Sequence, residues 1–140
     1  MIEQSELTEI IAVVSSMIAE MESRAFEDET FGQLTMRQVF YLDKIIRMEA
    51  PTFSEIADAC QITKPSVSAI VSTLIRKGYV EKVQDADDKR VYHVVVTEKG
   101  REFDALHQQI HQRMVNALLS GLDENDIETL TTILRKAMKK

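Results

Sequence analysis

The apolar residues of this chain recur with a helical period along most of its length, but between Tyr79 and Val96 they follow the two-residue period of a strand. Two β-branched runs, Tyr79–Val83 and Val91–Val96, flank the polar segment QDADDKR. This arrangement predicts a β-hairpin with a charged loop. Four glycines and two prolines in 140 residues leave little room for turns, which favours long helices elsewhere. The predicted fold class is mainly α with a small β-wing.

Helix-capping sequences indicate where five helices begin. TMRQ at Thr35–Gln38 and TFSE at Thr52–Glu55 are capping boxes, in which a threonine and a residue three positions on satisfy each other's backbone amides. Thr63, Thr97 and Asp123 are placed to cap three more helices. The helices after Thr52 and Thr63 are short and joined by a tight turn, which is the outline of a helix-turn-helix.

A long apolar stripe marks a further helix at the start of the chain. Its members alternate in steps of four and three: Leu7, Ile11, Val14, Ile18, Met21 and Ala25. The two helices after the hairpin carry similar stripes. These stripes exceed what one small domain covers, so they predict packing against a second copy across a two-fold axis. On periodicity alone, an intramolecular helical bundle remains equally open.

The net charge of −6 is not spread evenly along the chain. Residues 1–34 hold eight acidic side chains and one basic, whereas residues 35–100 hold nine acidic and ten basic. The acidity is therefore a property of the N-terminal segment, and the helix-turn-helix region is slightly basic. A local positive charge favours nucleic acid as a partner, although a solvated surface of mixed charge explains it as well.

Several function classes are excluded by what the composition lacks. One cysteine, Cys60, excludes a disulfide framework and any multi-cysteine zinc site. Histidines occur only at positions 93, 107 and 111, and there is no glycine-rich phosphate loop, so no catalytic constellation is visible and an enzyme is not expected. No apolar run reaches the length of a membrane span and the first residues do not resemble a signal peptide, so we expect a cytoplasmic protein without membrane contact.

Three segments carry a resemblance to a known family. They are LTMRQVFYL at 34–42, FSEIADACQITKPSVSAIVSTLIRKGYV at 53–80 and DADDKRVYHVVVTEKGREF at 85–103. In this order and spacing they resemble the MarR family of bacterial transcriptional regulators, over almost the whole chain. The resemblance implies a winged helix-turn-helix plus a helical dimerisation region formed by the N- and C-terminal helices.

The domain organisation follows from that resemblance. Residues 1–140 would form a single domain, with a winged helix-turn-helix DNA-binding lobe at 35–100 and dimerisation helices at 1–34 and 101–140. The implied function is a regulator, a repressor by expectation, that binds a pseudo-palindromic operator in double-stranded DNA as a homodimer and responds to an unidentified effector. The alternative is a winged-helix module that binds another protein and reads no DNA sequence.

The helix after Thr63 would be the recognition helix, because its polar residues lie opposite its apolar stripe. Ser66 and Ser68 are placed for base edges, whereas Lys64, Arg76 and Lys77 suit phosphates. The predicted DNA-binding set is Lys64, Ser66, Ser68, Ser72, Thr73, Arg76, Lys89 and Arg90. The competing interpretation of the helix residues is an ordinary solvated face.

The hairpin tip has its own predicted roles. Arg90 has the reach to enter a minor groove, where negative potential attracts arginine. Asp88, two residues before it, would orient Arg90 and not touch DNA. Taken in isolation, a plain charged turn explains the same residues.

Two positions depart from the family pattern. Ala69 stands where family members often carry arginine, so one expected DNA contact is missing. Gln61 stands where the pattern often has glycine, in a turn that favours a positive φ.

The effector is left open by the sequence. His107 and His111 lie four apart on one helix and, by resemblance to zinc-sensing members, could bind zinc with Glu20 or Glu22; two polar histidines on a partly exposed face are the alternative. The segment LHQQIHQRMV at 106–115 also resembles the branch that represses fatty-acid biosynthesis, which implies an acyl-carrier effector; a small-molecule effector is the family's usual arrangement.

Overall fold

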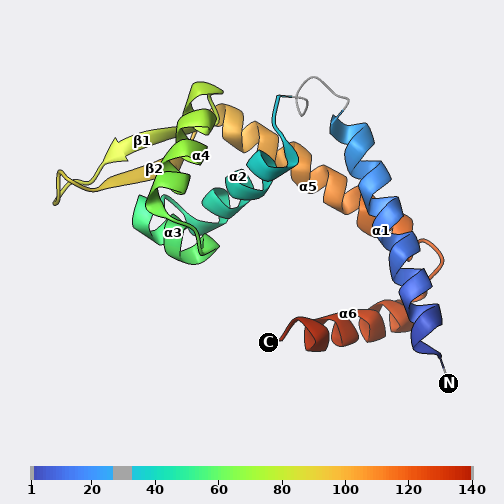
Figure 1. Cartoon of the computed structure of the whole chain (residues 1–140). Helices are drawn as coiled ribbons and strands as arrows, with labels where there is room; N and C mark the ends of the chain where they lie inside the picture. Colours follow the sequence, from blue (N-terminus) through green and yellow to red (C-terminus); the bar gives the residue numbers. More distant parts are fainter. Residues whose placement is uncertain (1, 27–32, 140) are drawn as a thin grey trace. The chain divides into compact units, whose positions relative to one another are not determined.

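The computed structural model describes residues 2–26 and 33–139, so residues 27–32 of the predicted segment 1–34 lie outside the described part. The described residues form six helices and one two-stranded antiparallel sheet (Figure 1). In chain order the elements are α1 (Gln4–Phe26), α2 (Met36–Met48), α3 (Phe53–Cys60), α4 (Lys64–Arg76), β1 (Val80–Gln84), β2 (Tyr92–Val96), α5 (Glu98–Leu119) and α6 (Glu124–Met138). The predicted fold class, mainly α with a small β-wing, is confirmed.

The chain divides into two compact units. One is Glu22–Gln108, which holds the helix-turn-helix and the hairpin, and the other combines Met1–Met21 with Gln109–Lys140. Helices α1 and α5 each contribute residues to both units. No helix in the described part of the chain is long and apolar enough to cross a membrane.

The predicted helix starts are confirmed by their hydrogen bonds. Thr35 Oγ1 accepts from the amide of Gln38 at 3.2 Å, and Gln38 Oε1 accepts from the amide of Thr35 at 3.0 Å. Thr52 and Glu55 form the second capping box at 3.1 and 3.4 Å. The other predicted caps also accept amide hydrogen bonds at helix starts: Thr63, Thr97 and Asp123. Each cap satisfies amides that have no partner inside the helix.

The turn between α3 and α4 contains a residue in the left-handed region. Gln61 has φ 52° and ψ 47°, so the positive φ expected at this position is present. The amide of the next residue, Ile62, donates to Ala57 O at 3.1 Å, which satisfies a carbonyl at the end of α3. A side chain with a Cβ is less stable than glycine in this conformation, so Gln61 carries local backbone strain.

Helix α4 ends at a glycine with positive φ. Gly78 has φ 86°, its amide donates to Ile75 O at 2.9 Å, and the amide of Tyr79 donates to Leu74 O at 3.0 Å. These two bonds form a Schellman motif. Because the Tyr79 amide bonds back to α4, the strand begins at Val80, one residue after its predicted start.

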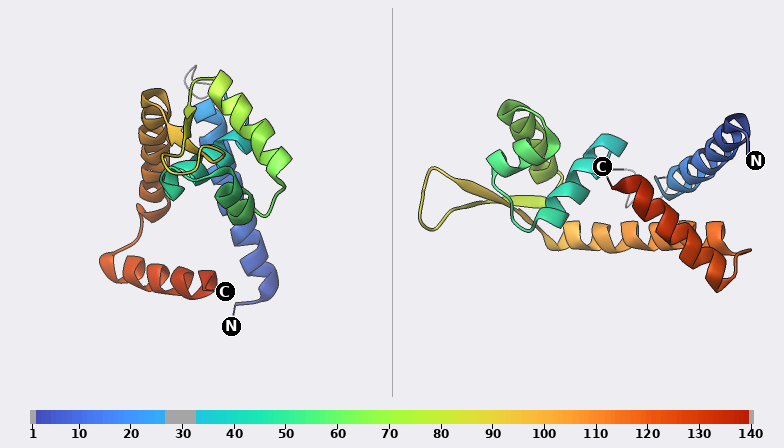
Figure 2. Two further views of the ribbon diagram at one scale, coloured as in Figure 1. Left: turned by 90° about the vertical axis from the view of Figure 1, so that its left-hand side faces the viewer. Right: turned by 90° about the horizontal axis from the view of Figure 1, so that it is seen from below.

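The hairpin is a regular antiparallel pair. Its register runs from Val80 opposite Val96 to Gln84 opposite Tyr92. Val80 and Val94 are buried, whereas the rest of β1 is exposed. The views in Figures 1 and 2 show the hairpin extending beyond the helices of its own unit, which leaves the loop at its tip accessible.

Most of the core lies within the unit Glu22–Gln108. Its fully or almost fully buried side chains come from α2, α3, α4, the hairpin and the first turns of α5: Leu42, Ile45, Ile56, Val67, Val71, Leu74, Tyr79, Val80, Val94 and Phe103. The Tyr79 and Phe103 rings meet edge to face, with centroids 5.8 Å apart. This core fixes the inner face of α4 and leaves its outer face available.

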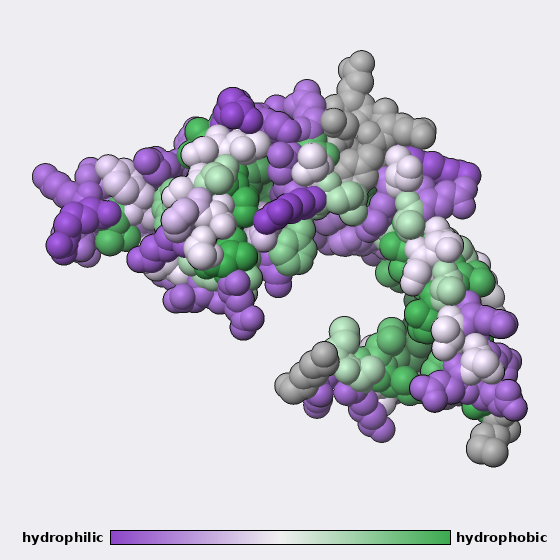
Figure 3. Space-filling model, viewed as in Figure 1, coloured by the Kyte–Doolittle hydropathy of each residue, from purple (hydrophilic) through white to green (hydrophobic). Residues whose placement is uncertain are grey.

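The other unit carries large exposed apolar side chains. On α1, Leu7 is 52% exposed and Ile11 is 57% exposed. Helix α6 has no buried residue, and Ile133 and Leu134 on it are 55% and 50% exposed. Figure 3 shows hydrophobic residues along both helices. Within a single chain, these stripes are therefore only partly covered.

Candidate nucleic-acid interface

The outer face of α4 carries most of the predicted recognition residues. Val67, Val71 and Leu74 of this helix are buried in the core. The predicted residues that are exposed are Lys64, Ser68, Ser72 and Arg76. Helix α4 contains no acidic residue, so its outer face is neutral or positive along its whole length.

Two predicted recognition residues, Ser66 and Thr73, are half-buried at the edge of this face. Thr63 Oγ1 donates to Ser66 Oγ at 2.9 Å, and Thr73 Oγ1 donates to Ala69 O at 3.1 Å. The Ser66 hydroxyl therefore keeps its own proton for donation, whereas the Thr73 proton is already used within the helix.

Lys77 is held by contacts inside the protein. Its Nζ donates to Gln33 O at 2.5 Å and to Gln38 Oε1 at 2.9 Å. These bonds connect the end of α4 to the start of α2. Lys77 thus supports the placement of α4, and the phosphate contact suggested by the sequence would require it to release these bonds.

At the hairpin tip, Asp88 and Arg90 form a bidentate ion pair. Asp88 Oδ1 accepts from Arg90 Nε at 3.1 Å and Oδ2 accepts from Nη2 at 3.2 Å. Hydrogen bonds from the side chain and the backbone of Arg90 lower the pKa of Asp88. The Arg90 side chain is 90% exposed. The ion pair is open to water and adds little stability, but it restricts the directions in which the guanidinium points. Lys89 beside it is exposed too.

A second carboxylate, Asp85, organises the loop from within. Its Oδ2 accepts from the amides of Asp87 and Asp88 at 3.0 and 2.9 Å, and its Oδ1 lies 2.7 Å from His93 Nε2. The Asp88 amide, the His93 ring and the Asp87 amide lower the pKa of Asp85 to about 2. The loop thus has an ionised acceptor at its base that shapes the tip where Arg90 lies.

His93 joins this loop to the connection between α2 and α3. Its Nδ1 lies 2.9 Å from Ala50 O, while Nε2 faces Asp85. Both partners are acceptors, so the ring satisfies both only when it is protonated on both nitrogens. The Asp85 carboxylate, followed by the Ala50 carbonyl, raises the pKa of His93. Sequence reasoning missed this pair because Ala50 and His93 are far apart along the chain and only the fold brings them together.

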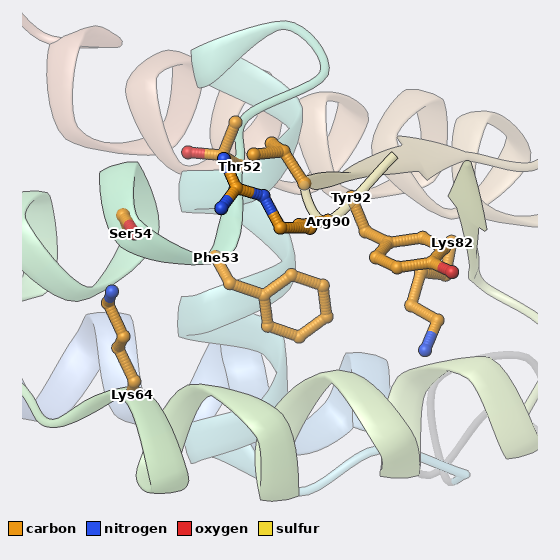
Figure 4. A pocket seen from close by; sticks show the side chains of 8 residues that line it. Thr52, Phe53, Ser54, Lys64, Lys82, Arg90 and Tyr92 are labelled. Carbon is orange, nitrogen blue, oxygen red and sulfur yellow. The ribbon is translucent and has the colours of Figure 1, made fainter. Parts of the chain in front are cut away.

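A cleft of about 550 Å³ lies between the start of α3, the start of α4 and the hairpin. Figure 4 shows cationic side chains reaching it from three elements: Lys64, Lys82 and Arg90. Phe53 and Tyr92 supply aromatic surface, and Lys82 Nζ lies 4.6 Å from the centroid of the Tyr92 ring. The described residues that line the cleft include no carboxylate. The cleft is therefore suited to an anionic group such as a phosphate.

Sequence reasoning placed only two of these three cations, Lys64 and Arg90, in the site. Lys82 was missed because, in the sequence, it is one lysine within a β-run. Its neighbour Val83 is apolar and yet 46% exposed. The alternation of apolar and polar residues in this run therefore does not reveal which face of the strand lies at the cleft. For Phe53 and Tyr92, nothing in the sequence beyond their aromatic character indicated a place in the site.

A second depression, of about 340 Å³, lies between α2 and α4. It is lined by Thr35, Arg37, Gln38, Tyr41, Ser66, Ala69, Ile70 and Thr73. The Arg37 guanidinium lies 5.8 Å from the centroid of the Tyr41 ring. Ala69, at which the sequence departs from the family pattern, is exposed and forms part of this surface.

The two histidines considered for zinc lie on α5. His107 stacks on Phe103 with ring centroids 5.8 Å apart, and its Nδ1 is 4.0 Å from Asp43 Oδ1. His111 is exposed. Among residues 2–26 and 33–139, no group of three or more histidine, cysteine or acidic side chains is arranged to hold a metal ion. A zinc site at these histidines stays a prediction without structural support.

Comparisons with known proteins show similarity to one family. Residues 34–92 match the model of the MarR family. YhjH, an uncharacterised HTH-type transcriptional regulator of Bacillus subtilis, is 28% identical over 104 residues, which is 74% of this chain and 59% of YhjH. MprA, a transcriptional repressor of Escherichia coli, is 28% identical over 92 residues, which is 62% of this chain and 49% of MprA. The chain thus matches about half to three fifths of the length of these two relatives.

Solved structures match over nearly the whole chain. FabT of Streptococcus pneumoniae superposes with a TM-score of 0.82 at 24% identity, covering 96% of this chain and 94% of FabT. A mutant of MepR from Staphylococcus aureus superposes with a TM-score of 0.65 at 27% identity, covering 99% of this chain and 97% of MepR. With its helix-turn-helix, its wing and these relatives, the chain is similar to the MarR family of transcriptional regulators, and its residues 34–92 match the model of that family.

Proposed function

We propose that this chain is a DNA-binding transcriptional regulator that acts in the cytoplasm as a homodimeric repressor on a pseudo-palindromic operator. The observation that carries the proposal is the cleft on which Lys64, Lys82 and Arg90 converge from α4, β1 and the hairpin loop. Three cations around one accessible cleft can bind the negatively charged phosphate backbone of a duplex. The structures of FabT and of mutant MepR are both complexes with DNA, which supports the same partner here.

The geometry suggests how the duplex would bind. The outer face of α4 is free of acidic side chains and presents Ser68 and Ser72, so it can lie in a major groove against base edges. Lys64 and Arg76 would contact phosphates and fix the register. Arg90, held by Asp88, would enter a neighbouring minor groove, where negative potential attracts a guanidinium.

The homodimer is supported by the exposed apolar faces of α1 and α6. Side chains such as Leu7, Ile11, Ile133 and Leu134 are each at least half exposed in the single chain. Large exposed apolar surfaces on a folded protein mark interaction sites. A second copy covers such faces by two-fold symmetry and sets two recognition helices about one helical turn apart.

The repressor role is supported by the similarity to MprA, which is a transcriptional repressor. The effector that would release or engage the protein is unidentified, and zinc, a small molecule and an acyl carrier are all candidates. The alternative function is a winged-helix module that binds another protein and reads no DNA sequence.

Fluorescence anisotropy tests the proposal with duplexes that the protein selects from a random library. We expect saturable binding that weakens with salt, because phosphate contacts release counterions. Lys64→Ala and Arg90→Ala should each weaken binding and lower the slope of log affinity against log salt, by about one for each phosphate that is no longer neutralised. Lys136→Ala, which removes an exposed lysine of α6, is the matched control and should leave the slope unchanged.

Two results would contradict the proposal. If no duplex is enriched and binding is independent of salt, the protein-binding alternative replaces it. If sedimentation of the complex gives one chain for each duplex, the dimeric arrangement is wrong even though DNA binding stands.

A further inference from the structure

The depression between α2 and α4 has no role in the predicted contacts, apart from Ser66 and Thr73 at its edge. It has a volume of about 340 Å³ and opens beside the outer face of the recognition helix. Its exposed α4 residue is Ala69, a position where the sequence predicts only the absence of an arginine contact. If this surface faces DNA, the depression is occupied in the complex either by a group of the DNA or by trapped water.

Some of the hydrogen-bonding groups of the lining are engaged inside the protein. Thr73 Oγ1 donates to Ala69 O at 3.1 Å, and Gln38 Oε1 accepts from Thr35 N and Lys77 Nζ at 3.0 and 2.9 Å. Beside the polar ends of Arg37, Tyr41 and Ser66, the lining offers the apolar surface of Ala69, Ile70 and the methyl-bearing threonines. The part of the depression at Ala69 and Ile70 is therefore suited to an apolar group.

The positive charges of the depression and of α4 indicate which molecule carries that group. Arg37 lines it from α2, and Lys64 and Arg76 are the charged residues of α4. These positive charges favour a polyanion, and the depression continues the face already assigned to DNA. In a major groove, the apolar group presented by a base is the C5 methyl of thymine, and alanine and threonine methyls are its usual contacts.

We propose that this depression receives the C5 methyl of a thymine in each half-site, which makes Ala69 a specificity-determining residue. The inference rests on the proposed DNA binding and deepens it. Arg37 at the edge would bind a nearby phosphate and hold the thymine in register. Removing one buried methyl group corresponds to about a fourfold loss of affinity.

Methyl scanning of the selected operator tests this inference. Each thymidine is replaced in turn by deoxyuridine, which removes the C5 methyl and keeps the base pair. We expect one position in each half-site at which wild-type protein loses affinity by about fourfold, with changes below about twofold elsewhere. In Ala69→Gln, which places a longer, polar side chain where the methyl would bind, the loss at that position should disappear. Ala105→Gln, an exposed alanine on α5, is the matched control and should keep the full loss.

The outcomes separate this inference from the proposed function. If the operator binds tightly but no thymine methyl matters, the depression has another role and DNA binding still stands. If the methyl effect persists in Ala69→Gln, the methyl is read by other residues and the inference is wrong. If glutamine blocks all binding, Ala69→Ser, which adds one hydroxyl, should show a reduced methyl effect, and an undiminished one overturns the inference. If no duplex is selected, both proposals fail together.

Discussion

Gly100 lies where the first turn of α5 passes the end of α4, and it is buried. A Cβ atom placed on it would lie 2.3 Å from Tyr79 O and 2.7 Å from Val96 Cγ1. The nearer atom is a backbone carbonyl that also accepts from the Thr97 amide at 3.1 Å, so it cannot move without loosening that bond. Alanine at this position therefore forces α5 away from the hairpin.

The cost can be worked from that overlap. Cβ atoms essentially never approach within 3.0 Å of another heavy atom, so the two segments must separate by at least about 0.7 Å. Overpacking of this kind costs about 3 kcal/mol, and the higher helix propensity of alanine returns at most about 1 kcal/mol. We expect Gly100→Ala to lower the free energy of unfolding by about 2 to 3 kcal/mol, or the melting temperature by about 10 °C.

Gly121 supplies a matched control within the same chain. It has no positive φ, and a Cβ there would meet nothing within 4 Å. Gly121→Ala should therefore change the free energy of unfolding by less than about 0.5 kcal/mol. Urea unfolding followed by circular dichroism measures both variants. Equal stabilities for the two alanine variants would refute the close approach of α5 to Tyr79.

Two further predictions concern the turn at Gln61 and the ion pair at His93. Gln61→Gly should raise the free energy of unfolding by about 1 kcal/mol, because φ is 52° there, and urea unfolding that shows no gain would contradict the strain. The raised pKa of His93 stabilises the fold fully below the ordinary histidine pKa of 6.5, and this contribution is lost as pH rises through the raised pKa. The stability difference between wild type and His93→Gln should thus shrink from pH 6 to pH 9. Asp85→Asn should lower the pKa of His93, measured by NMR titration of the ring, and an unchanged pKa would exclude the pair.

The helix starts could be predicted because their determinants are local. Thr35 and Gln38, like Thr52 and Glu55, satisfy each other across three residues, so the sequence alone specifies both partners. The hairpin could be predicted for a similar reason, since its two β-branched runs are separated only by the charged loop. Three strand boundaries lie one residue from the predicted ones, since β1 runs from Val80 to Gln84 and β2 begins at Tyr92. The start of β1 differs because the Tyr79 amide bonds back to α4 and cannot join the ladder.

The candidate site was only partly predictable, because its members meet through the fold. Lys64 and Arg90 follow from their places on a recognition helix and a hairpin tip, but Lys82 joins them only where β1 passes α4. The bond between His93 and Ala50 O depends in the same way on how the hairpin packs on the α2–α3 connection. No period or cap in the sequence encodes such pairings.

The order of the elements, the caps that start them and the inward face of α4 follow from local sequence, since they depend on residues within one or two helical turns. Tertiary structure decided which polar groups converge: the cationic cleft, the hollow beside Ala69 and the ion pair of Asp85 with His93. It also decided that Gly100 must lack a side chain, because only packing brings the Tyr79 carbonyl against it. The physical reason is that local hydrogen bonds are set by spacing along the chain, whereas clefts and close approaches are set by a core assembled from distant segments.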